Sequence, residues 1–382
     1  MNTLESIRTL FEQRFETRPV LFHAPGRINL IGEHTDYNQG WVLPAAIDRG
    51  LWFAVAPNKS NQCHVVAADI GQEAIIPLPK PVPEKRMWVN YLAGIAHTLE
   101  LKENQGFDCV FGGNLPVGAG LSSSAAMECG MAFALNRLFD LGLEPKELAK
   151  LAQRSSNSFV GVPCGIMDQF ASLMGKSEMA ILLDCRNLVY EYIPAHFENH
   201  ALLLVDSGVH HELAESAYGE RVLECAAGVE LLSRFYPEVT HLRDVSPAML
   251  ESQRALFDPV TYQRCRYVVF ENERIHKACL LLKAGKMGEL GALLQQTHAG
   301  LRDDYAVSCS ELDFLAAFAN QYPGVAGARM MGGGFGGCTL NLLEKSVLPT
   351  FREDIRIAYR ETFGIEATVL EVNIGDGVRE VT

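Results

Sequence analysis

A stretch rich in glycine and serine, residues 114–126, constrains the fold of this chain more than any other segment. It reads Asn-Leu-Pro-Val-Gly-Ala-Gly-Leu-Ser-Ser-Ser-Ala-Ala and leads into an apolar run that ends at Leu138. Gly118 and Gly120 permit positive φ and carry no Cβ, so the backbone can curl around an anion. The serines at 122–124 would open a buried helix whose first turn offers unpaired N–H groups. The pattern predicts either a phosphate-binding loop or a plain turn into a serine-capped helix.

The charge of the chain limits what such a loop can bind. The stretch matches neither the Gly-x-Gly-x-x-Gly dinucleotide pattern nor the Walker pattern, so it needs partners elsewhere before it indicates an enzyme. Thirty-three Lys plus Arg against 46 Asp plus Glu give a net charge of -13, which argues against general binding of nucleic acid or anionic membranes. A phosphate ligand would have to be held locally, by backbone amides, a metal ion and a few placed cations.

The cysteines and the apolar segments indicate a cytoplasmic protein. Ten cysteines occur, and no two form a Cys-x-x-Cys pair, a spacing that suits reduced thiols better than a disulfide framework or a zinc site. The N-terminus carries early charge, and no run of 18 apolar residues occurs, so we expect no membrane segment. The sequence does not decide between a monomer and a weak dimer.

The periodicity of the chain changes near residue 190, where we place a domain boundary between residues 1–190 and 191–382. Short strand-like segments at 20–23, 51–56, 64–67, 73–78 and 107–112 dominate the first part, with helical spacing at 4–15, 88–101 and 147–159. The second part is mainly amphipathic helices, such as 260–283, with strand candidates at 326–331, 338–343 and 367–372. Because strands and helices do not alternate regularly, we predict an α+β fold rather than a doubly wound sheet.

The segment from Pro25 to Tyr37 concentrates chargeable groups beside glycines. It reads Pro-Gly-Arg-Ile-Asn-Leu-Ile-Gly-Glu-His-Thr-Asp-Tyr. Carboxylates beside an imidazole suit recognition of a neutral polyol, because each carboxylate accepts hydrogen bonds from adjacent hydroxyls. A metal site is a weaker interpretation, since the His-Glu-x-x-His spacing is absent. A solvated loop with local ion pairs is the third.

Two further segments carry possible site residues. Val162 to Phe170 contains a single carboxylate, Asp168, which either caps a helix or is held partly desolvated for chemistry. The segment 329–338 has five glycines in the six positions 332–337. Such a backbone either bends sharply or is approached closely by another group.

Together these four segments resemble the galactose, homoserine, mevalonate and phosphomevalonate (GHMP) kinase superfamily, and within it the galactokinase family. Residues 26–37 are similar to the galactokinase signature, and 118–125 to the superfamily phosphate loop. Residues 164–169 and 332–337 are similar to the remaining motifs, and 298–304 to a segment of the second domain. The resemblance implies a two-domain α+β kinase fold, with an N-terminal ribosomal-protein-S5-like domain, a C-terminal ferredoxin-like domain and the active site between them.

The resemblance also implies an activity and a set of site residues. The activity would be transfer of the γ-phosphoryl group of MgATP to the C1 hydroxyl of D-galactose, which suits a site that acts by positioning and charge neutralisation. Catalysis would rest on Asp168 and Arg27, and the sugar would be bound by Glu33, His34, Asp36, Gly165, Asp168 and Tyr218. ATP would be bound by Gly118, Ala119, Gly120, Leu121, Ser122, Ser123, Ser124 and Trp88, and Mg²⁺ by Ser123. There are two alternatives: a kinase for a related sugar such as N-acetylgalactosamine, and a sugar-sensing regulator.

Two positions depart from the family pattern. Ser156 stands where many relatives have a glutamate at the metal, and Arg221 is followed by Val222 where consecutive arginines are more usual. Mg²⁺ commonly keeps several waters, which makes loss of one carboxylate tolerable. We hypothesise that Ser156 weakens metal affinity and shifts more of the metal contact to Ser123.

Overall fold

The computed structural model describes residues 3–116, 120–210 and 214–381. Its strands are β1 (Val20–Asn29), β2 (Trp41–Val42), β3 (Pro44–Pro57), β4 (Gln62–Ala67), β5 (Gln72–Pro77), β6 (Phe107–Gly113), β7 (Met179–Asp184), β8 (Tyr190–Pro194), β9 (His200–His210), β10 (Val325–Met330), β11 (Gly336–Glu344), β12 (Thr368–Val372) and β13 (Arg379–Val381). Its α-helices are α1 (Leu4–Phe15), α2 (Met87–Thr98), α3 (Ser123–Leu138), α4 (Pro145–Ser155), α5 (Met167–Met174), α6 (Ala214–Ser233), α7 (Pro247–Ser252), α8 (Pro259–Lys283), α9 (Met287–Ala299), α10 (Ser310–Gln321) and α11 (Leu348–Phe363). Short 3-10 turns are η1 (Asp36–Asn38), η3 (Leu242–Asp244), η4 (Arg254–Leu256) and η6 (Lys345–Val347), and π-helical turns are η2 (Ser156–Val160) and η5 (Gly300–Asp304).

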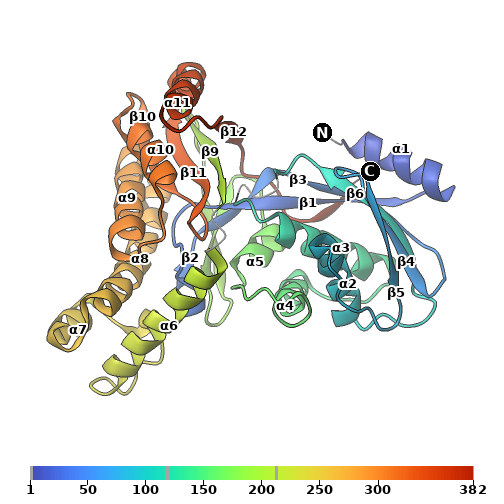
Figure 1. The fold of residues 1–382 in the computed structure, drawn as a ribbon, viewed down its shortest axis with the longest axis horizontal. Helices are drawn as coiled ribbons and strands as arrows, with labels where there is room; N and C mark the ends of the chain where they lie inside the picture. The colour runs from blue at the N-terminus through green and yellow to red at the C-terminus, as the bar shows by residue number, and fades with distance from the viewer. Residues whose placement is uncertain (1–2, 117–119, 211–213, 382) are drawn as a thin grey trace.

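The N-terminal half is built on a six-stranded sheet in the order β13-β1-β3-β6-β4-β5. Only the β4 and β6 pair is parallel among the paired strands of this sheet. Helices α2 to α5 cover one face and α1 covers the other (Figure 1). Nearly every residue of β1 is buried, which fits a strand covered on both faces.

The C-terminal half contains a four-stranded antiparallel sheet in the order β10-β11-β9-β12. Successive side chains of β9 point to opposite faces, as in any strand. Leu202 and Leu204 join the large core that also includes residues of the first sheet, whereas Leu203 and Val205 pack with the cluster under α10 and α11. The same core therefore passes between the two halves of the molecule.

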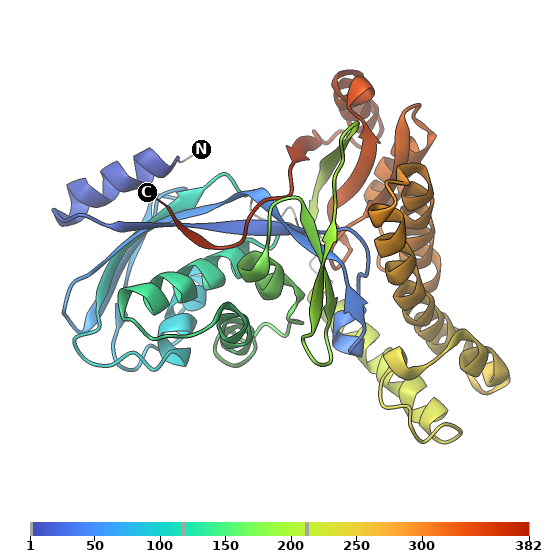
Figure 2. The same ribbon diagram turned by 180° about the vertical axis from the view of Figure 1, so that it is seen from behind.

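Helices α6 and α7 and the first half of α8 form a helical arm beside the second sheet (Figure 2), whereas the second half of α8 joins the large core. A third sheet has three strands, β2, β7 and β8. Its strands come from both sides of the domain boundary predicted at residue 190. The last strand, β13, returns to the first sheet and pairs with β1. The predicted α+β class is confirmed, while the strands after residue 190 are shared among all three sheets.

Most predicted elements occur, with shifted ends. The helix expected at 4–15 is α1, and the one expected at 260–283 is α8 with one more residue. The helix expected at 147–159 starts at Pro145 and changes to the π-helical turn η2 at Ser156. A wider turn of this kind is common at functional sites.

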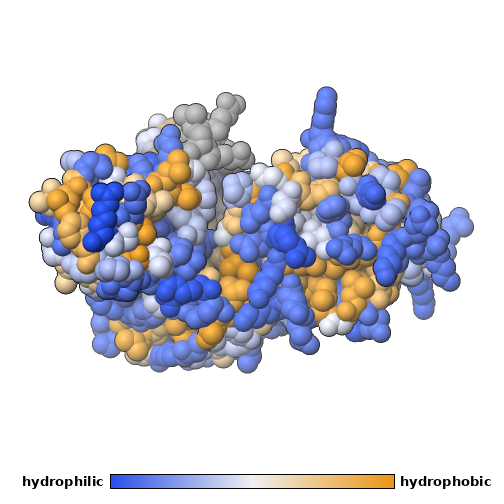
Figure 3. All heavy atoms as spheres, turned by 90° about the horizontal axis from the view of Figure 1, so that it is seen from below, coloured by the Kyte–Doolittle hydropathy of each residue, from blue (hydrophilic) through white to orange (hydrophobic). Residues whose placement is uncertain are grey.

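None of the helices within the described ranges is both long enough and apolar enough to cross a lipid bilayer. On the face seen in Figure 3, hydrophobic residues are interspersed with hydrophilic ones over both halves of the molecule.

Candidate active site

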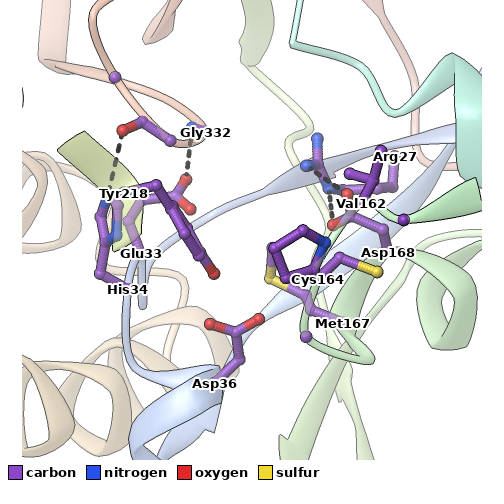
Figure 4. A pocket seen from close by; sticks show the side chains of 15 residues that line it. Arg27, Glu33, His34, Asp36, Val162, Cys164, Met167, Asp168, Tyr218 and Gly332 are labelled. Carbon is purple, nitrogen blue, oxygen red and sulfur yellow. Dashed lines mark hydrogen bonds and ion pairs between the residues drawn. The ribbon is translucent and has the colours of Figure 1, made fainter. Parts of the chain in front are cut away.

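A cavity of about 320 Å³ lies where the two halves meet. Figure 4 shows Arg27 and Asp168 on one side of it and Glu33, His34 and Gly332 on the other. Its volume is at the lower end of the range typical of small-molecule sites. The lining residues come from β1 and the loop after it, the turn before α5 and its first residues, helix α6 and the glycine turn: Arg27, Glu33, His34, Asp36, Gly161, Val162, Pro163, Cys164, Gly165, Met167, Asp168, Tyr218, Gly332, Gly333 and Gly334.

Arg27 and Asp168 form a two-point ion pair at the edge of the cavity. Arg27 Nε donates to Asp168 Oδ1 at 2.7 Å, and Arg27 Nη2 donates to Oδ2 at 3.0 Å. Burial alone would lower the pKa of Arg27, but the charge of Asp168 raises it above its ordinary value. The guanidinium therefore stays charged and holds the carboxyl group of Asp168 in a fixed orientation.

The local chain explains where both groups lie. The register of β1 and β3 shifts between Pro25 and Arg27, which marks a bulge. The Arg27 backbone N–H donates to Leu121 O at 3.1 Å, and Arg27 Nη1 donates to Gly120 O at 2.6 Å. Asp168 lies in the first turn of α5, where the helix dipole favours a negative charge.

Glu33 is paired with an arginine that the sequence did not single out. Arg329 Nη2 and the Gly332 backbone N–H both donate to Glu33 Oε1, at 3.0 and 2.9 Å. The Arg329 side chain has 0% of its surface exposed and the Glu33 side chain 3%. This contact ties the end of β10 and the glycine turn to the segment predicted to bind the sugar.

His34 lines the cavity, but both of its ring nitrogens have protein partners. Nδ1 lies 2.9 Å from Tyr37 Oη, and Nε2 lies 3.1 Å from Gly333 O. Burial lowers the pKa of His34 to about 4. The imidazole is therefore neutral at pH 7.

Asp36 presents a carboxylate to the cavity and forms no ion pair within the described ranges, although it lies near enough to Arg27 to interact with its charge. Its pKa is raised to about 6, mainly by burial; a hydrogen bond from the Tyr37 backbone N–H lowers the pKa, and the nearby charges of Asp168 and Glu33 raise it. Gly165 is required beside it, because a Cβ at that position would lie 1.7 Å from Asp36 Oδ2. Such a carboxylate is well suited to accept hydrogen bonds from sugar hydroxyls.

Tyr218 completes the wall beside His34. Its ring lies 5.6 Å from that of His34 and 5.1 Å from that of Tyr37. Figure 4 shows its side chain reaching into the cavity between Glu33 and Asp36. All six residues expected at the sugar thus line one cavity.

The expected phosphate loop is described only in part, because Gly118 and Ala119 lie outside the described residues. Helix α3 begins at Ser123, and Ser122 precedes it with a positive φ of 57°. Ser122 does not cap the helix: its hydroxyl donates to Asp168 Oδ2. The first N–H groups of α3, at Ser123 and Ser124, have no partner within the helix.

Trp88 lies away from the cavity, at the start of α2 beside strand β5 of the first sheet. Its Nε1 donates to Gln72 Oε1 at 2.9 Å, and its ring packs against Phe111 at 5.8 Å. It is absent from the residues that line the described cavity. A contact with adenine stays a prediction.

Ser156 contacts a buried glutamate that the sequence analysis overlooked. Ser156 Oγ lies 2.7 Å from both carboxylate oxygens of Glu128. Burial raises the pKa of Glu128 to about 8. Within the described ranges, no three His, Cys, Asp or Glu side chains converge as they would around a bound metal ion.

The overlooked residues have one signal in common. Arg329 and Glu128 are charged residues inside apolar segments, Ala-Arg-Met-Met and Ala-Met-Glu-Cys. A charge in such a segment is buried once the element forms, and a buried charge requires a partner or a proton. The rule identifies the residue but not its partner.

Comparisons with known proteins agree with this geometry. Residues 9–57 match the galactokinase galactose-binding signature, 90–176 the GHMP kinases N terminal domain and 278–360 the GHMP kinases C terminal model. A galactokinase from Roseiflexus sp. is 41% identical over 98% of this chain and 96% of its own. One from Lacticaseibacillus paracasei is 37% identical over the whole of both chains.

Solved structures extend the likeness. The crystal structure of Lactococcus lactis galactokinase complexed with galactose covers all of both chains, with a TM-score of 0.94 and 32% identity. Methanococcus jannaschii mevalonate kinase has a TM-score of 0.68 at 16% identity, covering 94% of this chain and 99% of its own. The second likeness concerns the fold alone.

Proposed function

This chain belongs to the galactokinase family of the GHMP kinases, and on that premise we propose how its cavity carries out the reaction. It is an ATP-dependent sugar kinase that transfers the γ-phosphoryl group of ATP to the C1 hydroxyl of D-galactose, giving galactose 1-phosphate and ADP. The observation that carries the proposed site is that the sugar signature and Asp168 line one cavity.

Asp36 and Tyr218 are the proposed primary contacts of the sugar. The Asp36 carboxylate has no paired cation in the described ranges, so it accepts hydrogen bonds from two sugar hydroxyls. The close approach of Gly165 to Asp36 brings the backbone of that turn to the same sugar face. His34 acts mainly by holding the glycine turn, since both its ring nitrogens are engaged.

Asp168 is the proposed partner of the attacking hydroxyl. Its Oδ2 accepts from Arg27 and Ser122, whereas Oδ1 accepts from Arg27 alone. Oδ1 therefore has capacity to accept the proton of the C1 hydroxyl and orient its oxygen toward phosphorus. Arg27 uses three of its five N–H groups on Asp168 and Gly120, and the other two face the transferring phosphoryl group.

The phosphates of ATP are proposed to lie at the N-terminus of α3. Its free N–H groups and the helix dipole attract an anion, and Arg27 is tied to the same turn through Gly120 and Leu121. Mg²⁺ would neutralise phosphate charge while held by the Ser123 hydroxyl. Phosphate oxygens and waters would supply the other ligands, since Mg²⁺ commonly keeps several waters.

Ser156 gives a test of the metal proposal. Its hydroxyl is bonded to Glu128, so it supplies no charge to a metal. Ser156→Glu should lower the Mg²⁺ concentration needed for the half-maximal rate and for half-maximal ATP binding in calorimetry. Ser156→Ala is the matched control, and an unchanged Mg²⁺ requirement in Ser156→Glu would rule the idea out.

A panel of sugars tests the function as a whole. Purified chain with MgATP should release ADP on addition of D-galactose, and less on addition of D-glucose or N-acetylgalactosamine. Preference for N-acetylgalactosamine would reassign the substrate. Galactose binding without ADP release would identify a sugar-sensing regulator instead.

The setting of the reaction follows from composition. All ten cysteines are free thiols, which supports a reducing compartment such as the cytoplasm. The acidic net charge of -13 supports the absence of a nucleic-acid partner. A monomer or weak dimer stays a prediction, to be settled by sedimentation.

A further inference from the structure

A chain of buried hydrogen bonds leads from the helical arm to the sugar pocket. Cys225 Sγ lies 3.2 Å from Tyr305 Oη, which lies 2.6 Å from Tyr37 Oη. Tyr37 Oη lies 2.9 Å from His34 Nδ1, and His34 Nε2 lies 3.1 Å from Gly333 O. Cys225 and Tyr305 are buried. They lie outside the lining of the cavity and have no place in the proposed reaction.

The direction of every bond follows from the peptide carbonyl at one end. A carbonyl only accepts, so His34 Nε2 carries a hydrogen. The ring is neutral because burial lowers the pKa of His34 to about 4, so Nδ1 is bare and accepts from Tyr37. A phenol has one hydrogen, so Tyr37 accepts from Tyr305, and Tyr305 accepts from the Cys225 thiol.

The far end of the chain is fixed by the helical arm. Asn38 Nδ2 donates to Cys225 Sγ at 3.6 Å. Arg221, which lies on α6 as Cys225 does, donates from Nε to Tyr305 O at 2.7 Å. The Tyr305 ring packs against that of Tyr267 at 4.7 Å. Tyr305 is thus held by its backbone, its ring and its hydroxyl.

The near end of the chain fixes the glycine turn. Glu33 accepts from the Gly332 N–H and His34 donates to Gly333 O, so two consecutive residues bind the backbone of two consecutive glycines. The Phe335 N–H donates to Val307 O at 2.8 Å. A Cβ at Gly334 would lie 2.1 Å from Val307 O. The turn is therefore enclosed by the sugar signature on one side and the segment after η5 on the other.

We propose that Tyr37 and Tyr305 are positioning residues for the sugar pocket: they fix His34 in the tautomer with hydrogen on Nε2, and His34 holds Gly333 and Tyr218 at the sugar. The inference rests on the proposed function for its kinetic consequence, but the tautomer itself is a property of the ligand-free protein. A hydroxyl chain with one allowed direction acts as a single unit. The effect of a substitution on galactose binding should therefore be smaller the farther the altered residue lies from His34.

The experiment combines imidazole NMR with kinetics. In protein labelled with ¹⁵N-histidine, a long-range ¹H–¹⁵N correlation should show His34 with Nε2 protonated and Nδ1 bare, and His34→Asn identifies the signal by its loss. Tyr37→Phe leaves Gly333 O alone to select the tautomer, so the Nδ1 signal should move toward that of an imidazole nitrogen without a hydrogen bond. The variant should also raise the KM for galactose about tenfold, the effect of one lost hydrogen bond, with kcat and the KM for ATP within about twofold.

Two further variants should change the KM for galactose less than Tyr37→Phe does. Tyr305→Phe should raise the KM for galactose about threefold, because Tyr37 still donates to His34 but loses its own donor. Cys225→Ser keeps a donor and should change little. Tyr236→Phe removes an exposed hydroxyl bonded to Ser252 and is the control for loss of a phenol. If Tyr37→Phe does not fold, Tyr305→Phe carries the test.

Several results would overturn the proposal. One is a wild-type His34 protonated on Nδ1 or on both nitrogens. Another is a Tyr37→Phe or Tyr305→Phe protein with an unchanged Nδ1 signal of His34 and an unchanged KM for galactose. A lower unfolding midpoint with unchanged kinetics would mean a structural role only. If the wild-type chain does not phosphorylate galactose while His34 shows the Nε2–H tautomer, the proposed function fails and the hydrogen-bond chain stands.

Discussion

Two arginine–carboxylate pairs lie at the same cavity and differ in how much water reaches them. In the pair of Arg27 and Asp168, the side chains expose 7% and 31% of their surface. In the pair of Arg329 and Glu33, they expose 0% and 3%. The chemical groups are the same, so the surroundings decide their roles.

The buried pair of Arg329 and Glu33 has a structural role. Arg329 also donates to Leu30 O at 3.0 Å and to Met330 O at 2.6 Å, and contacts Asn29 O. It thereby joins β10 to the end of β1. The open pair is arranged for chemistry, because Asp168 keeps an oxygen facing the cavity while Arg27 reaches the turn before α3. A carboxylate beside arginine is therefore available to a substrate only where its surroundings leave it open, as they do for Asp168 at 31% exposure and not for Glu33 at 3%.

Asp168→Asn should cause the largest effect on activity. The amide cannot take a proton from the sugar, so kcat should fall by roughly two to four orders of magnitude. The free energy of unfolding should fall by no more than about 1–2 kcal/mol, because asparagine still accepts from Arg27 and water reaches the site. Steady-state ADP release and urea unfolding measure the two quantities.

A third pair supplies the control for this variant. Asp184 and Arg243 also form a two-point ion pair, with Arg243 Nη2 at 2.7 Å from Asp184 Oδ2. Neither residue lines the cavity. Asp184→Asn should lose stability and keep kcat. A similar loss of kcat in both variants would remove the distinction between the pairs.

Arg329→Met should cause the next largest effect, and on stability. It leaves the Glu33 carboxylate buried beside one N–H group, so the free energy of unfolding should fall by about 3–5 kcal/mol. Arg352→Met is the matched control, because its pair with Glu371 is 38% and 40% exposed and should contribute under about 1 kcal/mol. Equal losses in urea unfolding would contradict the role assigned to burial.

Glu128 is a buried carboxyl group that, unlike Asp168 and Glu33, forms no ion pair within the described ranges. Its pKa rises from 4.5 to about 8 in the folded chain. As pH rises between these values, the unfolded chain releases this proton before the folded chain does, so stability is lost by about 1.4 kcal/mol per pH unit at most. Glu128→Gln should flatten the fall in unfolding free energy from pH 5 to 8. Parallel profiles for both proteins would show that Glu128 is ionised when folded.

The sequence predicted which segments meet, but not how their atoms pair. Asp36, Asp168 and Tyr218 were expected together from the resemblance to the galactokinase family, and they line one cavity. The contact of Arg329 with Glu33 spans 296 positions, and nothing local encodes it. Ser122 was expected at the phosphates, yet its left-handed backbone turns the hydroxyl to Asp168. Such a rotation depends on the packed turn rather than on residue type.

The position of the transferred phosphoryl group tests the central claim most directly. Purified chain, MgATP and D-galactose should yield one sugar phosphate, observed in a ³¹P–¹H correlation. The account predicts that its phosphorus couples to the anomeric proton, and that Asp168→Asn gives no such signal on the same timescale. Coupling to the C6 methylene protons, or no product while ATP and galactose both bind, would contradict the proposed placement of C1 at Asp168.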